Sequence, residues 1–184
     1  MDTITNDLNT AGDLIKLSAS GRYELVKGVL KNLSPSGKTH GFISANICTI
    51  ISNFVKKHKL GLVTGAETGY KLSSNPDTVR APDMAFESND KLAESGFTEG
   101  YSTVMPELVV EVNSPNDIYS EVINKVNEWL NAGVDQVWII EPKNKTVVIH
   151  STKGSTVLTS AEEMDGGDIL PGFKCKVAEI FELY

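Results

Sequence analysis

The feature that most constrains the fold is the run LVVEV at residues 108–112, which is apolar except for Glu111. Nearly continuous apolar sequence of this length is typical of a β-strand that other elements cover on both faces. The strand is predicted to cover residues 107–112, and a helix is predicted next, at residues 118–132. Turn residues at 114–117 precede that helix, and Gly133 ends it.

A further strand, predicted at residues 137–140, completes a strand–helix–strand order. This order implies a right-handed crossover, and therefore parallel pairing within a mixed sheet. A second long helix is predicted at residues 39–58, because apolar residues recur there at three-to-four spacing. Shorter patterns predict a helix at 11–17, strands at 23–26, 29–33, 62–64, 67–72, 79–86 and 146–150, and a polar loop at 87–103.

The length of 184 residues suits one domain, and the sequence contains no repeat or linker. We therefore expect a single α/β domain, a central mixed β-sheet flanked by helices, over residues 21–184. Residues 1–20 are expected to form a partly frayed N-terminal segment, with the fraying in about the first ten residues.

The excess of acidic over basic residues bears on whether the protein binds nucleic acid. Asp and Glu number 24 against 17 Lys and Arg, a net charge of −7, which disfavours a basic surface that coats nucleic acid. Cys48 and Cys175 lie far apart, which argues against a disulfide scaffold or a thiolate zinc site and favours a reducing, cytoplasmic location. The polar N-terminus does not resemble a signal peptide, and no apolar run is long enough to cross a membrane.

Three charged residues stand in segments that are otherwise apolar: Asp83, Glu111 and Lys125. A buried carboxylate needs a cation, hydrogen-bond donors or water, and Lys125 falls at the edge of the apolar arc of its helix. Carboxylates on adjacent strands form a hard oxygen site that suits Mg²⁺ or Mn²⁺. A lysine beside them can stabilise charge at phosphorus, or orient and deprotonate water. These groups suit metal-dependent phosphodiester hydrolysis, and the ion would offset the acidic charge.

Each of these residues also has an ordinary interpretation. Asp83 can be a turn or cap acid, and Glu111 can be a strand-end carboxylate paired with Arg80 or with a lysine. Lys125 can form a surface ion pair with Glu121, four residues earlier on the same helix.

Several ordered motifs resemble the PD-(D/E)XK nuclease superfamily, and within it the Uma-two family of restriction-type endonucleases. They are RAPD at residues 80–83, PELVVEVNSP at 106–115, and Lys125 in the helix that follows. The likeness continues from YELVKG at 23–28 to AGVDQVWII at 132–140 and LPGF at 170–173. It implies a restriction-endonuclease-like fold and a Mg²⁺- or Mn²⁺-dependent endonuclease that acts on DNA. We also expect a homodimer.

Carried over residue by residue, the resemblance makes Asp83 and Glu111 the metal ligands, with the carbonyl of Val112 as a third. Lys125 takes the role of the catalytic lysine. In much of the superfamily that lysine lies two residues beyond the Glu, where this chain has Asn113.

Glu24 and His40 match polar positions of the family and are expected to line the cleft, Glu24 by way of a water on the metal. Without the resemblance, Glu24 can equally be a solvated strand residue, and His40 an exposed residue at a helix start.

The chain departs from the family at two places. Residues 106–108 read PEL where the family often has PDL, and residues 116–120 read NDIYS where it often has several arginines. The only arginines are Arg22 and Arg80, which predicts weak, salt-sensitive DNA binding. One alternative function is a catalytically inactive interaction or DNA-binding protein that keeps the nuclease fold. Another is a nuclease that acts on RNA or on branched or damaged DNA, and the sequence does not choose among these substrates.

Overall fold

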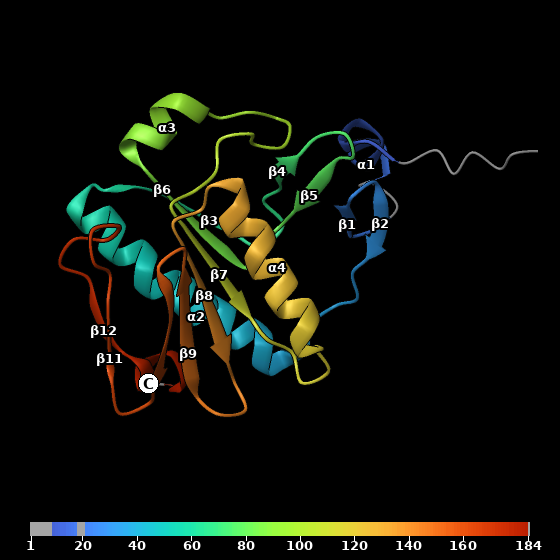
Figure 1. Cartoon of the computed structure of the whole chain (residues 1–184). Helices are drawn as coiled ribbons and strands as arrows, with labels where there is room; N and C mark the ends of the chain where they lie inside the picture. The colour runs from blue at the N-terminus through green and yellow to red at the C-terminus, as the bar shows by residue number, and fades with distance from the viewer. Residues whose placement is uncertain (1–8, 18–20, 184) are drawn as a thin grey trace, which may run out of the picture.

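A mixed six-stranded sheet lies at the centre of the computed structural model, which describes residues 9–17 and 21–183 (Figure 1). The strand order is β10-β9-β8-β7-β6-β3. β7 and β8 pair in parallel, whereas the other neighbouring strands of this sheet pair antiparallel. The strands are β3 (Gly61–Gly65), β6 (Met84–Ser88), β7 (Leu108–Val112), β8 (Gln136–Glu141), β9 (Thr146–Ser151) and β10 (Gly154–Thr159).

Two long helices cover opposite faces of this sheet. Figure 1 shows α4 (Tyr119–Ala132) in front of the sheet and α2 (Lys38–His58) behind it. α4 connects β7 to β8, so the predicted parallel pairing and the predicted α/β class with flanking helices are confirmed. The three-to-four spacing of α2 places one apolar stripe in the core, which consists of Ile43, Ile47, Ile51 and Val55.

A second, four-stranded sheet lies beside the first, in the order β2-β1-β5-β4. Helix α1 (Ala11–Leu17) packs on it, because Leu14 forms a small buried cluster with Leu25 and Val79. The strands are β1 (Tyr23–Val26), β2 (Val29–Asn32), β4 (Tyr70–Ser73) and β5 (Thr78–Arg80).

The C-terminal part of the chain closes over the face of the central sheet that carries α2. It adds β11 (Glu163–Asp165), β12 (Lys174–Lys176) and α5 (Val177–Phe181), whose buried side chains join the α2 core. The LPGF segment contributes two of them, Leu170 and Phe173.

Three local predictions were wrong. Residues 79–86 form two strands in different sheets rather than one strand, because Pro82 has no N–H to donate to a sheet ladder. The strand predicted at 67–72 begins at Tyr70, since Glu67 has a φ of 73° in a turn. The region 87–103 contains α3 (Asn89–Ser95), which Ser88 caps by accepting the N–H of Lys91. The predicted fraying of residues 1–8 lies outside the described residues.

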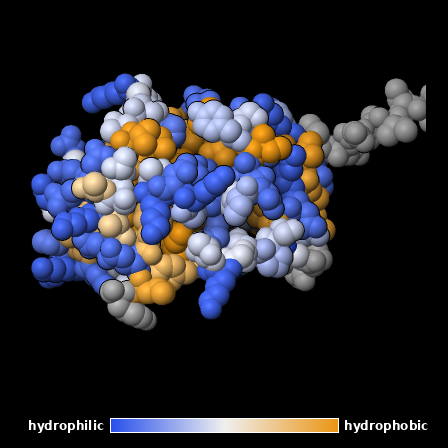
Figure 2. Space-filling view, turned by 90° about the horizontal axis from the view of Figure 1, so that it is seen from below, coloured by the Kyte–Doolittle hydropathy of each residue, from blue (hydrophilic) through white to orange (hydrophobic). Residues whose placement is uncertain are grey.

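The face toward which β7 and β8 run carries mostly hydrophilic side chains, with hydrophobic residues in separate patches (Figure 2). Within residues 9–17 and 21–183, no helix combines the length and the hydropathy needed to cross a bilayer.

Candidate active site

Asp83 and Glu111 come together through the pairing of β6 with β7. Met84 lies opposite Val110 in this antiparallel pair, so one further step of the register brings Asp83 opposite Glu111. The bend at Pro82 ends the ladder there, and Asp83 Oδ2 accepts a hydrogen bond from the N–H of Val112 at 2.8 Å. Two carboxylates therefore lie at the ends of adjacent strands.

Glu111 is 8% exposed, although it carries a carboxylate. Its oxygens each lie 2.8 Å from Nζ of Lys125, and Oε1 also accepts the indole N–H of Trp129 at 3.0 Å. Burial raises the pKa of Glu111 to about 7; the Lys125 charge opposes this rise, while Asp83 and Glu24 add to it. The pairing of Glu111 with a lysine is confirmed.

Lys125 points from α4 into the site rather than along the helix surface toward Glu121. Its Nζ lies 2.8 Å from Glu111 and 3.5 Å from Oε1 of Glu24. Burial alone would lower the pKa of Lys125, but the charges of Glu111 and Glu24 outweigh it and raise the pKa. The side chain is therefore an ammonium ion at neutral pH.

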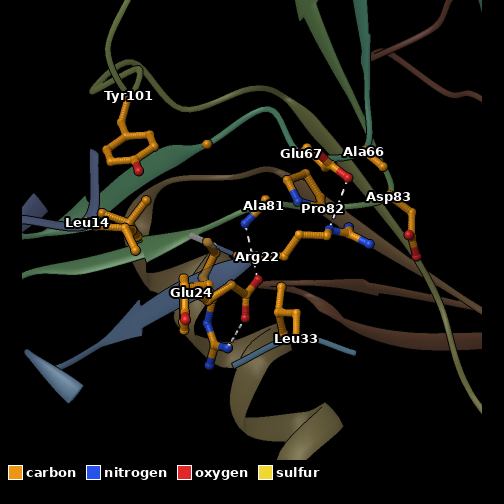
Figure 3. Close-up of a pocket in the computed structure, with 15 residues that line it drawn as sticks. Leu14, Arg22, Glu24, Leu33, Ala66, Glu67, Ala81, Pro82, Asp83 and Tyr101 are labelled. Atoms are coloured by element: carbon orange, nitrogen blue, oxygen red, sulfur yellow. Dashed lines mark hydrogen bonds and ion pairs between the residues drawn. The ribbon is translucent and has the colours of Figure 1, made fainter. Parts of the chain in front are cut away.

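Glu24 reaches the site from β1 and is 4% exposed, so it is a buried residue and not a solvated one. Oε2 accepts a hydrogen bond from Nη1 of Arg80 at 2.6 Å, and Oε1 accepts the N–H of Ala81 at 3.1 Å (Figure 3). Burial would raise the pKa of Glu24, but the charges of Lys125 and Arg80 lower it below its ordinary value. Glu24 is therefore ionised.

His40 lies in the first turn of α2, and its side chain is 14% exposed, so it is not an exposed helix-start residue. Nε2 lies 3.3 Å from Oδ2 of Asp83, and Nδ1 lies 3.3 Å from Oγ of Ser44. The hydrogen bond with Asp83 raises the pKa of His40; burial opposes the rise, and the charge of Asp83 and the backbone of Val112 support it. His40 thus holds Asp83 from the side of α2.

All six residues that the sequence singled out converge. Five of them lie in β1, α2, β7 and α4, and Asp83 lies in the bend before β6: Glu24, His40, Asp83, Glu111, Val112 and Lys125. The structure adds two residues of α4 that were not predicted as site residues from the sequence. Glu128 accepts hydrogen bonds from Nε and Nη2 of Arg80, at 2.9 and 2.7 Å, and Trp129 donates to Glu111. Glu128 and Trp129 follow Lys125 by three and four residues, and this helical spacing could have indicated that they lie beside it.

The donor set suits part of the shell of a hard divalent cation. Among the described residues, no group of three or more His, Cys, Asp or Glu side chains is arranged to hold an ion. Mg²⁺ needs fewer, since it typically binds one or two carboxylates and completes its shell with waters and phosphate oxygens. Asp83 and Glu111 meet that requirement. Because Lys125 contacts both oxygens of Glu111, an ion that binds there must displace the ammonium from at least one of them.

A cleft of about 560 Å³ gives access to Glu111 and Lys125, which both line it. It lies between α4 and the β1–β2 hairpin. A phosphodiester that enters the cleft would meet the end of β7 and the ammonium together, whereas Asp83 lines a separate pocket.

Comparisons with known proteins identify the family and the fold. The model of the Uma2 family, described as "Putative restriction endonuclease", matches residues 12–178. The chain is also similar to a crystal structure described as a putative nuclease belonging to DUF820 from Anabaena variabilis ATCC 29413. That pair has 17% sequence identity and a TM-score of 0.77, with 94% of this chain and 97% of that chain covered, so the likeness establishes the fold. The curated proteins include no match.

Proposed function

Because the chain belongs to the Uma2 family of restriction-endonuclease-like proteins, we propose that it is a metal-dependent endonuclease that hydrolyses phosphodiester bonds of DNA. The observation that carries the proposal is the contact of the Lys125 ammonium with both oxygens of Glu111, beside a second carboxylate, Asp83, at the end of the adjacent strand. An ammonium between carboxylates at a cleft wall suits the charge that develops on a phosphoryl group.

Asp83 and Glu111 would hold Mg²⁺ or Mn²⁺, with the carbonyl of Val112 as a third ligand. The ion would polarise a phosphoryl oxygen and lower the pKa of water. His40 keeps the carboxylate of Asp83 in place through its contact at 3.3 Å.

Lys125 acts in this proposal as a cation and a hydrogen-bond donor rather than as a general base. Its pKa is raised, so it keeps its proton at neutral pH. When Glu111 turns to the ion, the ammonium can donate to a phosphoryl oxygen and neutralise part of the charge there. Glu24, ionised and 3.5 Å away, helps to keep Lys125 protonated.

The test is cleavage of supercoiled plasmid DNA with Mg²⁺ or Mn²⁺. We expect Asp83→Asn and Lys125→Met each to lower the rate at least about a hundredfold, the usual cost of losing a positioned charge. Asp90→Asn and Lys153→Met change the same residue types at exposed positions and should leave the rate unchanged. Equal rates in all five proteins would refute the proposal.

Calorimetric titration with Mn²⁺ separates the proposal from the alternative, a catalytically inactive nuclease-fold protein. Binding that Asp83→Asn abolishes supports the nuclease, and no binding to the wild type favours the alternative. The homodimer and the cytoplasmic location stay predictions, and light scattering after size-exclusion chromatography tests the first.

A further inference from the structure

A second pocket, of about 220 Å³, adjoins the candidate metal site. In Figure 3, Tyr101 and Leu14 lie on one side of it and Asp83 lies on the other, with Ala81 and Pro82 between them. The volume is several times the roughly 30 Å³ that a water molecule takes up in the liquid, so there is room for a flat heterocycle. The pocket shares Asp83 with the site that would hold the metal.

The apolar wall of this pocket is held in place by the backbone. Ser102, next to Tyr101, donates its N–H to the carbonyl of Gly69 at 3.1 Å and accepts the N–H of Lys71 at 2.8 Å. A Cβ on Gly69 would lie 2.3 Å from the ring of Tyr101, so the absence of a side chain there lets the ring lie against the strand. The ring also packs on the buried cluster that contains Leu14. The wall is therefore preformed.

The opening of the pocket carries an ion pair. Nε of Arg22 lies 2.9 Å from Oε1 of Glu67, and the two side chains are 43% and 65% exposed (Figure 3). A guanidinium has five N–H donors, so one ion pair leaves Arg22 able to donate to a further acceptor. The pair thus offers donors and an acceptor side by side, as the edge of a nucleobase does.

The charges of the lining select the part of a nucleotide that can enter. The lining carries the carboxylates of Glu24, Glu67 and Asp83 against two guanidinium groups, and each guanidinium already lies against one of these carboxylates, so the lining has no surplus of positive charge to attract a phosphate. An uncharged base needs no such charge, and it can donate its own N–H groups to carboxylate oxygens. The ring of Tyr101 and the side chain of Leu14 provide the apolar surface on which a base stacks.

We infer that this pocket takes a single unpaired base, so that the preferred substrate is DNA with an unpaired or extruded base beside the phosphate that is cut. The inference rests on the proposed function and names its substrate class. A base inside an intact duplex cannot reach a lateral pocket, whereas a bulged or single-stranded base reaches it at little cost. Since the pocket and the metal site share Asp83, a base in the pocket would bring its own backbone to Glu111 and Lys125.

Fluorescence anisotropy with labelled DNA and Ca²⁺ in place of Mg²⁺ tests the inference through binding alone. The probes are a fully paired duplex, the same duplex with one unpaired base, and the single strand. We expect the wild type to bind the two probes with unpaired bases about tenfold more tightly than the duplex, as the stacking of one base implies. Tyr101→Ala should remove this preference, and Tyr101→Phe should keep it.

Phe97→Ala is the matched control, because it removes an aromatic ring that is 86% exposed and lies outside the pocket lining. Arg22→Gln is a second test, and because Arg22 is half-exposed, this variant should fold even if Tyr101→Ala does not. It should weaken the preference for unpaired bases at least about threefold, because one charged hydrogen bond to the base is lost.

Equal affinity of the wild type for the three probes would overturn the inference, and so would a preference that survives in both Tyr101→Ala and Arg22→Gln. Failure of the proposed function gives a different result. In that case no probe is cleaved with Mg²⁺ or Mn²⁺, whatever the base preference. Cleavage of all probes at one rate, with equal affinities, would leave the proposed function intact and refute the inference alone.

Discussion

Replacement of Arg80 by methionine tests the buried charge network that joins β5 to β1 and α4. Arg80 donates to Glu24 at 2.6 Å, and to Glu128 at 2.9 and 2.7 Å. The side chains of Arg80 and Glu24 are 13% and 5% exposed, so water cannot readily replace the lost donors around Glu24. Arg80→Met should therefore destabilise the fold while keeping most of the apolar stem of the side chain.

The size of the effect follows from what Glu24 and Glu128 retain. Removal of one partner from a buried ion pair costs about 3–5 kcal/mol, because the other charge stays buried. Glu24 keeps the N–H of Ala81 at 3.1 Å and Nζ of Lys125 at 3.5 Å, and Glu128 is 23% exposed and can gain water. We therefore expect the low end of that range, about 3 kcal/mol of unfolding free energy. For a domain of this size the melting temperature should fall by about 6–12 °C.

Urea denaturation followed by tryptophan fluorescence measures this loss. The double variant Arg80→Met with Glu24→Gln removes both charges, so it should be more stable than Arg80→Met alone. Glu128→Gln is the milder control and should cost less than about 1 kcal/mol, because its carboxylate is the more exposed of the two. A cost below about 1 kcal/mol for Arg80→Met, or a double variant no more stable than the single one, would refute the reasoning.

The loss of unfolding free energy in Arg80→Met should become smaller as the pH falls. Burial opposes ionisation of Glu24, but Lys125 and Arg80 bring its pKa below the ordinary value of 4.5. A carboxyl group with a lowered pKa stabilises the fold above the pKa of the unfolded chain, and this contribution is lost as the pH falls through the folded pKa. The stability gap between wild type and Arg80→Met should therefore be full at neutral pH and shrink below about pH 4.5. A gap that stays constant into acid would contradict this account.

Two further predictions concern the tryptophans and the cysteines. Trp129→Phe removes the N–H that donates to Glu111 at 3.0 Å, and should cost about 1–3 kcal/mol in the same denaturation assay. Trp138→Phe removes an N–H that donates to a neutral amide, so it should cost less, and the reverse order would contradict the assignment. Burial raises the pKa of the Cys175 thiol to about 12, so iodoacetamide at mildly alkaline pH should label Cys48 alone in the native protein and both thiols after denaturation. Peptide mass spectrometry measures the labelling, and fast native labelling of Cys175 would contradict its burial.

The elements with a strong period could be predicted from the sequence, because their burial follows that period. The helix predicted at residues 39–58 extends over Lys38–His58, and all five residues of β7 are buried, as the apolar run indicated. β10 gives no such signal, since five of its six residues are exposed. β10 is a strand because all six of its residues pair with β9. Such pairing depends on the neighbouring strand and cannot be predicted from the local sequence.

Pro82 is the reason why the strand predicted at residues 79–86 was wrong. The run at 79–86 is apolar enough for a single strand, but Pro82 cannot donate to a ladder, and the chain changes sheets there. A proline inside a predicted strand argues against a continuous strand, so the signal was present in the sequence. The break matters for the site, because it frees Asp83 from the ladder at the level of Glu111.

The candidate site residues could be named from the sequence because charge is costly where the pattern demands apolar side chains. The pattern indicated Asp83, Glu111 and Lys125, and the family resemblance added Glu24, His40 and the carbonyl of Val112. Which acid pairs with which cation depends on the register of β6 with β7 and on the packing of β1 beside α4, and local sequence specifies neither. Arg80 was accordingly weighed as a partner of Glu111, whereas it binds Glu24 and Glu128.

The net charge of −7 acquires a different meaning once the acids are located. Glu24, Glu111 and Glu128 line the cleft, but each lies against a cation, Arg80 or Lys125, so they add little field of their own. Asp117 and Glu121 also line the cleft, and neither forms an ion pair with another described residue, so they oppose the approach of a phosphate backbone. A divalent ion at Asp83 and Glu111 would reverse the sign of the charge at the point where a phosphate must sit. For this reason we expect the cleft to bind nucleic acid weakly without metal, and mainly through the metal site once an ion is bound.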